Sequence, residues 1–335
     1  MAVQQKDVEM AGSVILISGC RRSGTTLMRT VLSGHPDLLV HPWEAQFILD
    51  LWERFGTTIH NLPAALDYLA SHRYRPESVA TAAIYDRLPE SGAVDLQTFL
   101  KGYLDAWVAG EAENPIRRLV LKDPRFIFHL DLLDELSPGA VTINLIRDPR
   151  ANVASQRRRW PEAPLIECIQ RWLGSIHAAR EWEGKHPHRL VNLRFEDLIQ
   201  TPRQALQNLC LRLDVPFMEK ILNFSMVEER YLAGAPGRNT NEASILDQEV
   251  TYTGFESAPL DAWRDQLESV EVEIIEYLTR EEMRTWGYDP ERSPGRSRGF
   301  PLRLALERSK YLYRRSGQWV KALVRDRISR RRYRT

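Results

Sequence analysis

The sequence of 335 residues predicts an α/β fold with three layers, α/β/α, in which helices cover both faces of a central parallel sheet. Two observations predict this fold class. Short strands that are apolar throughout alternate with longer segments of helical periodicity, and such strands are typical of parallel sheets buried on both faces. In addition, the first strand runs through a tight glycine-containing loop into the beginning of a helix.

That first strand–loop–helix carries the most informative motif. A β-branched run at residues 14–17 leads to a turn and then to a helix with apolar positions. Gly19 and Gly24 are separated by four residues, as in a Walker A loop, but Thr25 stands where an ATPase needs lysine. Arg22 is the nearest cation inside the loop. Because backbone N–H groups and the helix dipole point at such a loop, it predicts a site for an anionic, phosphoryl-like group.

The other elements follow in order along the chain. Further strands are expected at residues 38–40, 118–122, 141–146 and 190–195, and helices over much of 45–111, at 130–136, after Pro149, at 165–183 and at 202–213. Ligands of parallel sheets bind beyond the carboxyl ends of the strands. Arg22, Lys122 and Arg147 lie at or just beyond three of those ends. The sequence therefore predicts a binding site at this edge of the sheet.

The charge of the chain is distributed unevenly. Residues 291–335 hold 15 Lys and Arg against three Asp and Glu, a net charge of +12, whereas the preceding 290 residues carry −11. The composition predicts a body over 1–290, a linker rich in Arg, Ser, Pro and Gly over 291–300, and a basic amphipathic tail over 301–335. We expect residues 301–328 to form a helix on an anionic membrane surface. A solvated or self-associating tail is the alternative, and no nucleic-acid partner is expected.

The remaining composition favours a cytoplasmic protein. Residues 1–13 lack the apolar core of a signal peptide, and no apolar run approaches 18 residues. The three cysteines have no spacing typical of a metal site or a disulfide framework. We therefore expect no metal, and a location in the cytoplasm with peripheral attachment to the membrane.

Three segments together resemble the sulfotransferases that use 3′-phosphoadenosine 5′-phosphosulfate, most of all the protein-tyrosine branch and its bacterial relatives. They are the segment from Arg22 to Arg29, Lys122-Asp123-Pro124, and Arg147-Asp148-Pro149-Arg150-Ala151 with Ser155. The resemblance covers residues 13–290. It implies the P-loop-like sulfotransferase fold, with this nucleotide as co-substrate and the hydroxyl of a peptidyl tyrosine, a sugar or a lipid as acceptor.

The resemblance also implies roles for individual residues. The loop would bind the 5′-phosphosulfate through Arg22, Ser23, Gly24, Thr25 and Thr26, with Arg22 also acting in catalysis. Arg147 and Ser155 would bind the ribose 3′-phosphate, and Lys122 would stabilise the bridging oxygen. A donor with two anionic ends needs two cationic sites, which agrees with this division. The neighbouring Arg157, Arg158 and Arg159 are interpreted as solvent-facing charges.

Two residues compete for the role of general base, which must take the proton of the acceptor hydroxyl. Glu44 lies near the end of the second strand, one residue beyond the position that a gap-free comparison with the tyrosine branch gives. His41 is the other candidate, because its unperturbed pKa suits the task. Two other functions stay open for the chain: a P-loop kinase-like phosphotransferase, and a nucleotide-binding protein without catalysis.

Overall fold

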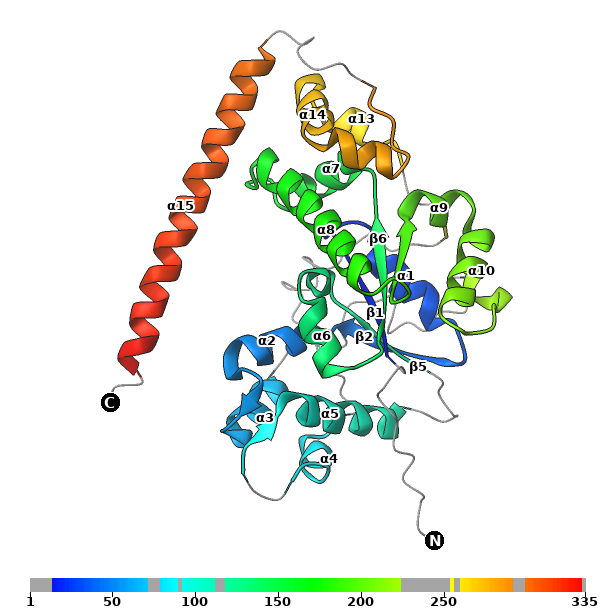
Figure 1. Ribbon diagram of the computed structural model, residues 1–335, viewed down its shortest axis with the longest axis vertical. Coiled ribbons are helices and arrows are strands. Elements are labelled where there is room, and N and C mark those ends of the chain that lie inside the picture. Colours follow the sequence, from blue (N-terminus) through cyan, green and yellow to red (C-terminus); the bar gives the residue numbers. More distant parts are fainter. Residues whose placement is uncertain are drawn as a thin grey trace, which may run out of the picture. The chain divides into compact units, whose positions relative to one another are not determined.

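The structure is a computed structural model that describes residues 14–71, 79–89, 92–111, 118–223, 254–255, 260–291 and 299–332, without the side chains of Glu111 and of residues 317–332. The chain divides into two compact units. Unit 1 comprises residues 1–146 and 177–258, and unit 2 comprises residues 147–176 and 259–335. Figure 1 labels the elements of both.

Unit 1 is built on a parallel sheet. Its strands are β1 (Val14–Gly19), β2 (Leu38–Glu44), β5 (Arg118–Lys122), β6 (Val141–Ile146) and β7 (Leu190–Arg194). They are arranged in the order β2-β5-β1-β6-β7, and every neighbouring pair is parallel. The five strands are those predicted from the apolar runs, and the parallel sheet is confirmed. Strand β1 lies in the middle, so that the loop after it begins at the centre of the carboxyl edge.

The edge strand β2 is longer than predicted and is irregular. Val40 pairs with Val120, but the next pair is Glu44 with Lys122, so β2 contains two more residues than β5 over this interval. Pro42, which has no N–H to donate, lies within the irregularity, as is typical of bulges on edge strands. The bulge places Glu44, rather than Pro42, opposite Lys122.

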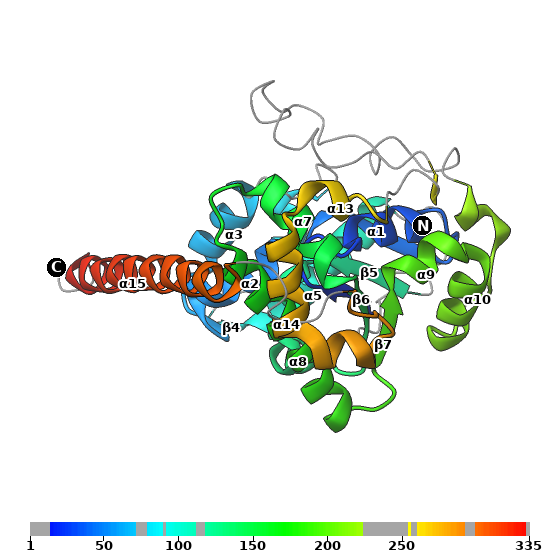
Figure 2. The same ribbon diagram turned by 90° about the horizontal axis from the view of Figure 1, so that it is seen from above.

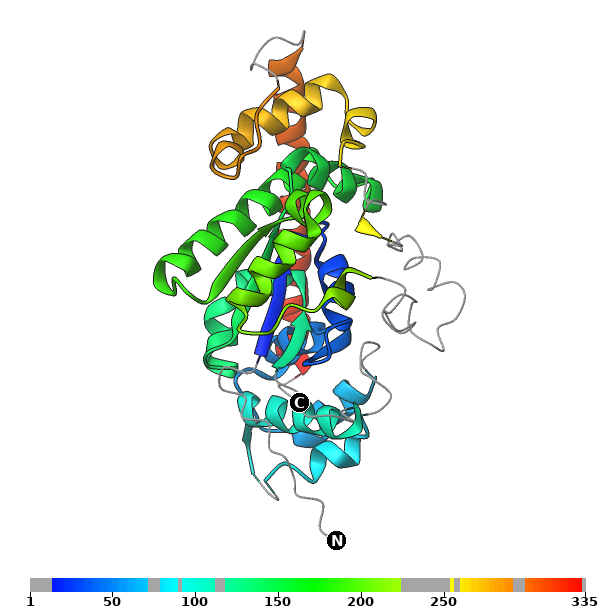
Figure 3. The ribbon, with the colours of Figure 1, turned by 90° about the vertical axis from the view of Figure 1, so that its right-hand side faces the viewer.

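Helices cover the sheet of unit 1. They are α1 (Thr25–Ser33), α2 (Gln46–Phe55), α3 (Leu62–Ser71), α4 (Thr81–Tyr85), α5 (Leu96–Glu111), α6 (Leu130–Leu136), α9 (Phe195–Gln200) and α10 (Pro202–Arg212), with 3-10 turns η1 (Pro124–Phe128) and η2 (Glu219–Leu222). The short strands β3 (Thr58–Ile59) and β4 (Val94–Asp95) pair antiparallel. Figures 1 and 3 show α3, α4 and α5 side by side, and Figure 2 shows α10 beside α9.

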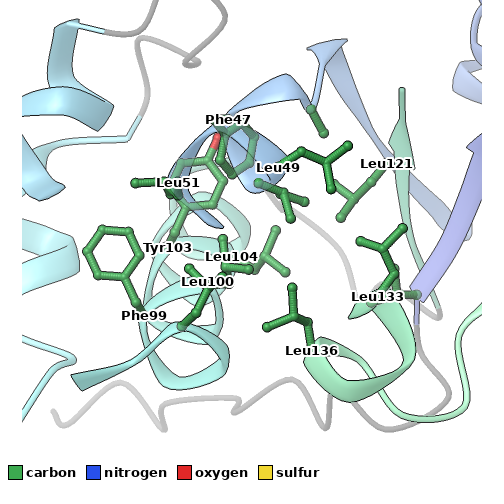
Figure 4. Close-up of a cluster of buried hydrophobic side chains, with 14 of the residues drawn as sticks. Phe47, Leu49, Leu51, Phe99, Leu100, Tyr103, Leu104, Leu121, Leu133 and Leu136 are labelled. Carbon is green, nitrogen blue, oxygen red and sulfur yellow. The ribbon is translucent and has the colours of Figure 1, made fainter. Parts of the chain in front are cut away.

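Alternation along the strands divides the apolar residues between the two faces of the sheet. Val14 and Leu16 of β1, with Leu119 and Leu121 of β5, belong to one cluster of buried side chains. Residues from α2, α5 and α6 complete this cluster, and Figure 4 shows Leu121 among them. Helix α1 packs on the sheet as well, where it contacts β1, β2 and β5. Burial on both faces explains why the strands contain so few polar residues.

Unit 2 is helical. It contains α7 (Pro149–Arg159), the first half of α8 (Leu165–Lys185), α13 (Trp263–Gln266), α14 (Ser269–Thr285) and α15 (Phe300–Arg332). The helical character of residues 301–328 was predicted, whereas α14 was not. Within the described part of the chain, no helix is both long enough and apolar enough to cross a bilayer.

The boundary at residue 290 that the composition suggests is not a boundary of the two units. Helix α15 begins at Phe300, and Phe300 lies in the core of unit 2 together with Val272 and Ile275 of α14. Leu304 and Tyr311 pack against the same core. The first turns of the basic segment are therefore part of unit 2, because one face of the helix supplies apolar side chains to its core.

Candidate active site

The loop between β1 and α1 has a fixed left-handed geometry. Gly24 has φ 94° and Arg22 has φ 72°, which is unusual for a residue with a Cβ. A Cβ on Gly24 would lie 2.3 Å from Cδ2 of Phe195, whose side chain is fully buried. The N–H of Ser23 donates to the carbonyl of Cys20 at 3.1 Å and closes the turn. The second glycine of the motif is therefore required by both backbone conformation and space.

The N-terminus of α1 is arranged to attract an anion. Gly24 is its N-cap residue and offers no side chain to the first-turn N–H groups, and that turn contains no acidic residue. The first N–H groups of a helix have no partner within the helix and carry the positive end of its dipole. Thr25 is buried, while Thr26 and Arg22 are partly exposed beside this terminus. The loop thus has the features of a phosphate-binding site.

Lys122 connects this loop with the end of β2. Its ammonium group forms an ion pair with Glu44 and donates to the hydroxyl of Thr26 at 3.3 Å. The side chain of Lys122 is only 3% exposed, whereas that of Glu44 is 24% exposed. The structure therefore brings together three of the predicted site residues, from β2, β5 and the start of α1.

The pair determines the protonation state of Glu44. Burial raises the pKa of its carboxyl, but the charge of Lys122 and hydrogen bonds from Lys122 and Gln46 outweigh that effect. The charge of Arg29 on α1 acts in the same direction. The pKa of Glu44 is lowered from 4.5 to about 2, so the group is a carboxylate at neutral pH.

A set of backbone and side-chain bonds holds Lys122 in place. The N–H of Asp123 donates to the carbonyl of Ile17 at 3.2 Å, and its carboxylate accepts the N–H of Arg125 at 2.8 Å, which caps η1. Arg125 also pairs with Asp50 of α2 at 2.9 Å. The hydroxyl of Ser18 accepts the N–H of Ile127 at 2.7 Å. The Lys-Asp-Pro segment is thus clamped to β1 and α2.

The second candidate base, His41, is in a different environment. It is fully buried, and its ring lies 5.0 Å from that of Trp107 and 5.7 Å from that of Phe47. Nδ1 lies 2.9 Å from the carbonyl of Trp43, and Nε2 lies 2.9 Å from the hydroxyl of Tyr103. The N–H of Trp43 also donates to Nδ1 at 3.3 Å, so His41 stabilises the bulge of β2. This geometry favours Glu44 as the base.

In unit 2, Arg147 and Ser155 lie before and within α7. The indole N–H of Trp172 donates to the carbonyl of Arg147 at 2.8 Å and fixes the backbone there. Arg147 is partly exposed, and Ser155 is buried at 6%. Asp148 accepts the N–H of Arg150 at 2.8 Å, and Pro149 is the first residue of α7. The predicted helix after Pro149 is therefore present, and Asp148 caps it.

One interpretation of the basic segment of α7 is wrong. Arg157 was expected to face solvent, but its guanidinium forms an ion pair of 2.7 Å with Glu271, whose side chain is 3% exposed. Glu271 belongs to α14, which the sequence did not reveal, so the partner could not be foreseen.

Three residues near the predicted site were not identified as contributors from the sequence. Arg29 is 7% exposed and acts on Glu44 through its charge. Gln46 donates to Glu44 at 2.5 Å, and Phe195 occupies the space beside Gly24. A signal existed for Arg29, which is a cation among the apolar positions of an otherwise buried helix.

A parallel sheet with a loop of the phosphate-binding kind after its central strand, and a Lys–Glu pair beside that loop, are features of group-transferring enzymes with a P-loop-like fold. The sequence matches the Sulfotransferase family over residues 14–219. The chain therefore belongs to the sulfotransferase family, which leaves the kinase alternative without support.

Curated relatives agree with this assignment. The chain is 24% identical over 323 residues to protein-tyrosine sulfotransferase A of Caenorhabditis elegans, covering 92% of this chain and 76% of that protein. It is 25% identical over 317 residues to protein-tyrosine sulfotransferase 1 of Danio rerio, covering 89% and 78%. Nodulation protein NoeE of Sinorhizobium fredii is 30% identical over 155 residues, which cover 46% of this chain and 33% of NoeE.

Solved structures agree in fold. The sulfotransferase domain from the curacin biosynthetic pathway superimposes with a TM-score of 0.59 at 23% identity, covering 83% of this chain and 98% of that domain. The sulfotransferase domain of the Synechococcus olefin synthase gives a TM-score of 0.56 at 22% identity, covering 86% and 99%. The predicted sulfotransferase fold is confirmed.

Proposed function

We propose that this sulfotransferase moves the sulfuryl group of 3′-phosphoadenosine 5′-phosphosulfate to the hydroxyl of an acceptor. One observation carries the proposal: Lys122 contacts both Glu44 and Thr26 beside the uncapped N-terminus of α1. Transfer to a hydroxyl needs a proton acceptor and groups that stabilise developing negative charge, and Glu44, Lys122 and the start of α1 can supply them.

The loop is suited to the phosphosulfate end of this donor. The backbone N–H groups at the start of α1, the hydroxyls of Thr25 and Thr26, and the charge of Arg22 would hold the anionic oxygens. The absence of acidic residues from the first turn of α1 supports this assignment, because a carboxylate there would repel the ligand. Arg22 would in addition stabilise charge that develops during transfer.

Lys122 and Glu44 would change partners during the reaction. In the ion pair, a carboxyl with a pKa of about 2 is ionised but is a weak base. When Lys122 instead donates to the oxygen that bridges sulfur and phosphorus, Glu44 loses its strongest stabilising partner and its pKa rises. Glu44 then accepts the proton of the acceptor hydroxyl, while the new S–O bond forms and the bond to the phosphate oxygen breaks. The donor supplies the sulfuryl group and the leaving phosphate.

The ribose 3′-phosphate of the donor needs a second cation. We assign Arg147 and Ser155 to it on the resemblance alone. A hydrogen bond to a charged group contributes roughly 1.5–3 kcal/mol. The tether of the Arg147 backbone to Trp172 supports a fixed position for such a contact.

The acceptor that we propose is a hydroxyl of a peptidyl tyrosine, a sugar or a lipid. The curated relatives that align over about nine-tenths of the chain are named for tyrosine. A phenol, with a pKa of about 10, also suits a carboxylate base better than an aliphatic alcohol does. A tyrosine hydroxyl is therefore the first acceptor to test.

Transfer of labelled sulfate from the nucleotide onto tyrosine peptides, glycans and lipids tests the proposal. We expect turnover on one of these classes and a loss of about 10²–10³ in kcat for Lys122→Met, by comparison with removal of one oxyanion donor. Lys185→Met is the matched control, because Lys185 is exposed and pairs with Glu181. No transfer by the wild type onto any class, with binding intact, would favour the nucleotide-binding protein without catalysis.

Calorimetry with adenosine 3′,5′-bisphosphate tests the donor separately. We expect this nucleotide to bind more tightly than ATP, which lacks the 3′-phosphate. Equal binding of both would contradict the assignment of the donor, whatever the acceptor.

A further inference from the structure

Helix α15 has two faces with different environments. One face packs on unit 2: Phe300 and Glu307 are buried at 8% and 3% exposure, and Arg303, Leu304, Tyr311 and Arg314 are partly buried. Arg303 lies 3.1 Å from Glu271, and Arg314 lies 3.1 Å from Glu167. These residues recur every three or four positions, so they form a single stripe along the helix.

The large exposed apolar side chains of α15 lie on the other face. Leu302 is 77% exposed, Leu306 48%, Leu312 62% and Tyr313 83%. At about 100° per residue they fall within an arc of about 120°, directed away from the packed stripe. The same arc passes through positions 320, 323 and 324, where the sequence has Val320, Leu323 and Val324, and Trp319 lies just beyond its edge. The apolar arc therefore continues for several turns in the sequence pattern.

Basic residues border this arc. Arg308 and Arg315 lie on one flank by the same helical rotation, and Lys310, which pairs with Glu307 at 2.8 Å, lies on the other. Within the part of the chain whose side chains are described, no carboxylate forms an ion pair with Arg308 or Arg315. Residues 300–332 hold 11 Lys and Arg against two Asp and Glu. An apolar face between basic flanks is the pattern of helices that lie in the plane of a membrane interface.

A second copy of the chain fits this face less well. A coiled-coil seam through Leu306, Tyr313 and Val320 would also use the intervening positions, which hold Ser309 and Ser316. Two helices of the same strong positive charge would in addition repel each other. A nucleic acid would satisfy the charge but not the leucines, since phosphate contacts use polar and basic groups.

We propose that α15 is a membrane-binding surface, which lies on an anionic bilayer with Leu302, Leu306, Leu312 and Tyr313 in the acyl region and Arg308, Arg315 and Lys310 at the phosphate groups. Because the packed stripe lies on the other side of the helix, α15 can bind lipid without leaving unit 2. The surface would concentrate the enzyme at a membrane whatever its acceptor is.

Flotation of the full chain with vesicles tests this proposal. We expect binding to vesicles of 70% phosphatidylcholine and 30% phosphatidylserine, much weaker binding to pure phosphatidylcholine, and weaker binding at high salt. The double variant Leu306→Glu/Tyr313→Glu should lose binding by at least tenfold. Leu211→Glu is the matched control, since Leu211 is 79% exposed on α10 of unit 1. It should bind as the wild type does.

Three outcomes would overturn the proposal. The first is equal flotation of the wild type and the double variant, provided that both have the same thermal midpoint. The second is a wild-type dimer in light scattering that the double variant converts to a monomer, which would assign the face to a second copy. The third is tighter binding of a labelled DNA duplex than of anionic vesicles, with the double variant unaffected.

Discussion

The two units of this protein each contain a buried basic residue that pairs with carboxylates, and the two clusters differ in how completely they are satisfied. In unit 1, Lys122 has Glu44 and the hydroxyl of Thr26, and Glu44 remains 24% exposed. In unit 2, Arg150 pairs with Asp148 at 2.6 Å and with Glu276 at 2.8 Å. Its guanidinium also lies 4.5 Å from the ring centre of Trp263.

This difference is what we expect between the proposed catalytic pair of unit 1 and a cluster that stabilises the fold of unit 2. The guanidinium of Arg150 donates from all of its nitrogens, including a bond of 3.2 Å to the carbonyl of Asp289. A ligand would have to break several of these bonds to engage Arg150. The ammonium of Lys122 is bound to two groups next to the N-terminus of α1. A ligand would have to replace only one of them to engage Lys122. In the sequence Lys122 and Arg150 look alike, because each is a cation within a few residues of the end of a predicted strand.

The largest effect is expected at the proposed base. Glu44→Gln should lower kcat about 10²–10⁴-fold, because the acceptor hydroxyl loses its proton acceptor. His41→Gln should reduce kcat far less, since His41 is fully buried beside the bulge, with its ring nitrogens near Trp43 and Tyr103. Steady-state kinetics of both variants on the best acceptor measure this. The reverse order of the two effects would transfer the role to His41.

Replacement of Arg150, whose guanidinium is fully hydrogen-bonded, should lower the stability of the fold. Arg150→Met leaves Asp148 and the fully buried Glu276 without their cation, so the free energy of unfolding should fall by about 3–5 kcal/mol. Arg264→Met is the matched control: its guanidinium lies 4.5 Å from the same Trp263 ring, but it is exposed and pairs with Glu291. Its loss should cost far less, because exposed ion pairs contribute little to stability. Urea titrations measure the loss of unfolding free energy in both variants. Equal losses would show that Arg150 matters no more to the fold than the exposed Arg264 does.

The ion pair of unit 1 should appear in the pH dependence of stability. The pKa of Glu44 is lowered from 4.5 to about 2 in the folded chain, so its ionised form stabilises the fold above pH 4.5. That contribution is lost as the pH falls toward 2. From pH 6 to pH 3 the wild type should lose about 2 kcal/mol more than Glu44→Gln does. Unfolding free energies are measured for both proteins at each pH. If they fall by the same amount from pH 6 to pH 3, Lys122 does not stabilise the carboxylate of Glu44.

The smallest effect is expected at the proposed 3′-phosphate contact. Arg147→Ala should weaken adenosine 3′,5′-bisphosphate by about one to two decades, the loss of one charged hydrogen bond of roughly 1.5–3 kcal/mol. Arg158→Ala, an exposed residue of the same helix α7, should bind as the wild type does. Calorimetry gives both constants. An identical loss of affinity in the two variants would show that the positive charge of the whole segment attracts the nucleotide, and that Arg147 makes no specific contact with its 3′-phosphate.

Much of unit 1 could be predicted from the sequence, because strands buried on both faces must be apolar throughout. The position of Glu44 opposite Lys122 could not be predicted. It depends on a bulge that the alternation of residues 38–44 does not reveal. Helix α14 was missed for another reason. Glu271, Glu273 and Glu276 are buried at 1–2% exposure and interrupt the apolar pattern. Cations from α7 and α15 make the burial of Glu271 and Glu276 tolerable.

The contact between Gly24 and Phe195 links the loop after β1 to the start of α9, 171 positions further along the chain. A Cβ at position 24 would collide with a ring carbon of that residue at 2.3 Å. A smaller aliphatic side chain at position 195 would remove this collision, but residue 24 would keep its left-handed backbone with φ 94°, which favours glycine. Attempts to reshape the loop should therefore keep Gly24 and vary its neighbours.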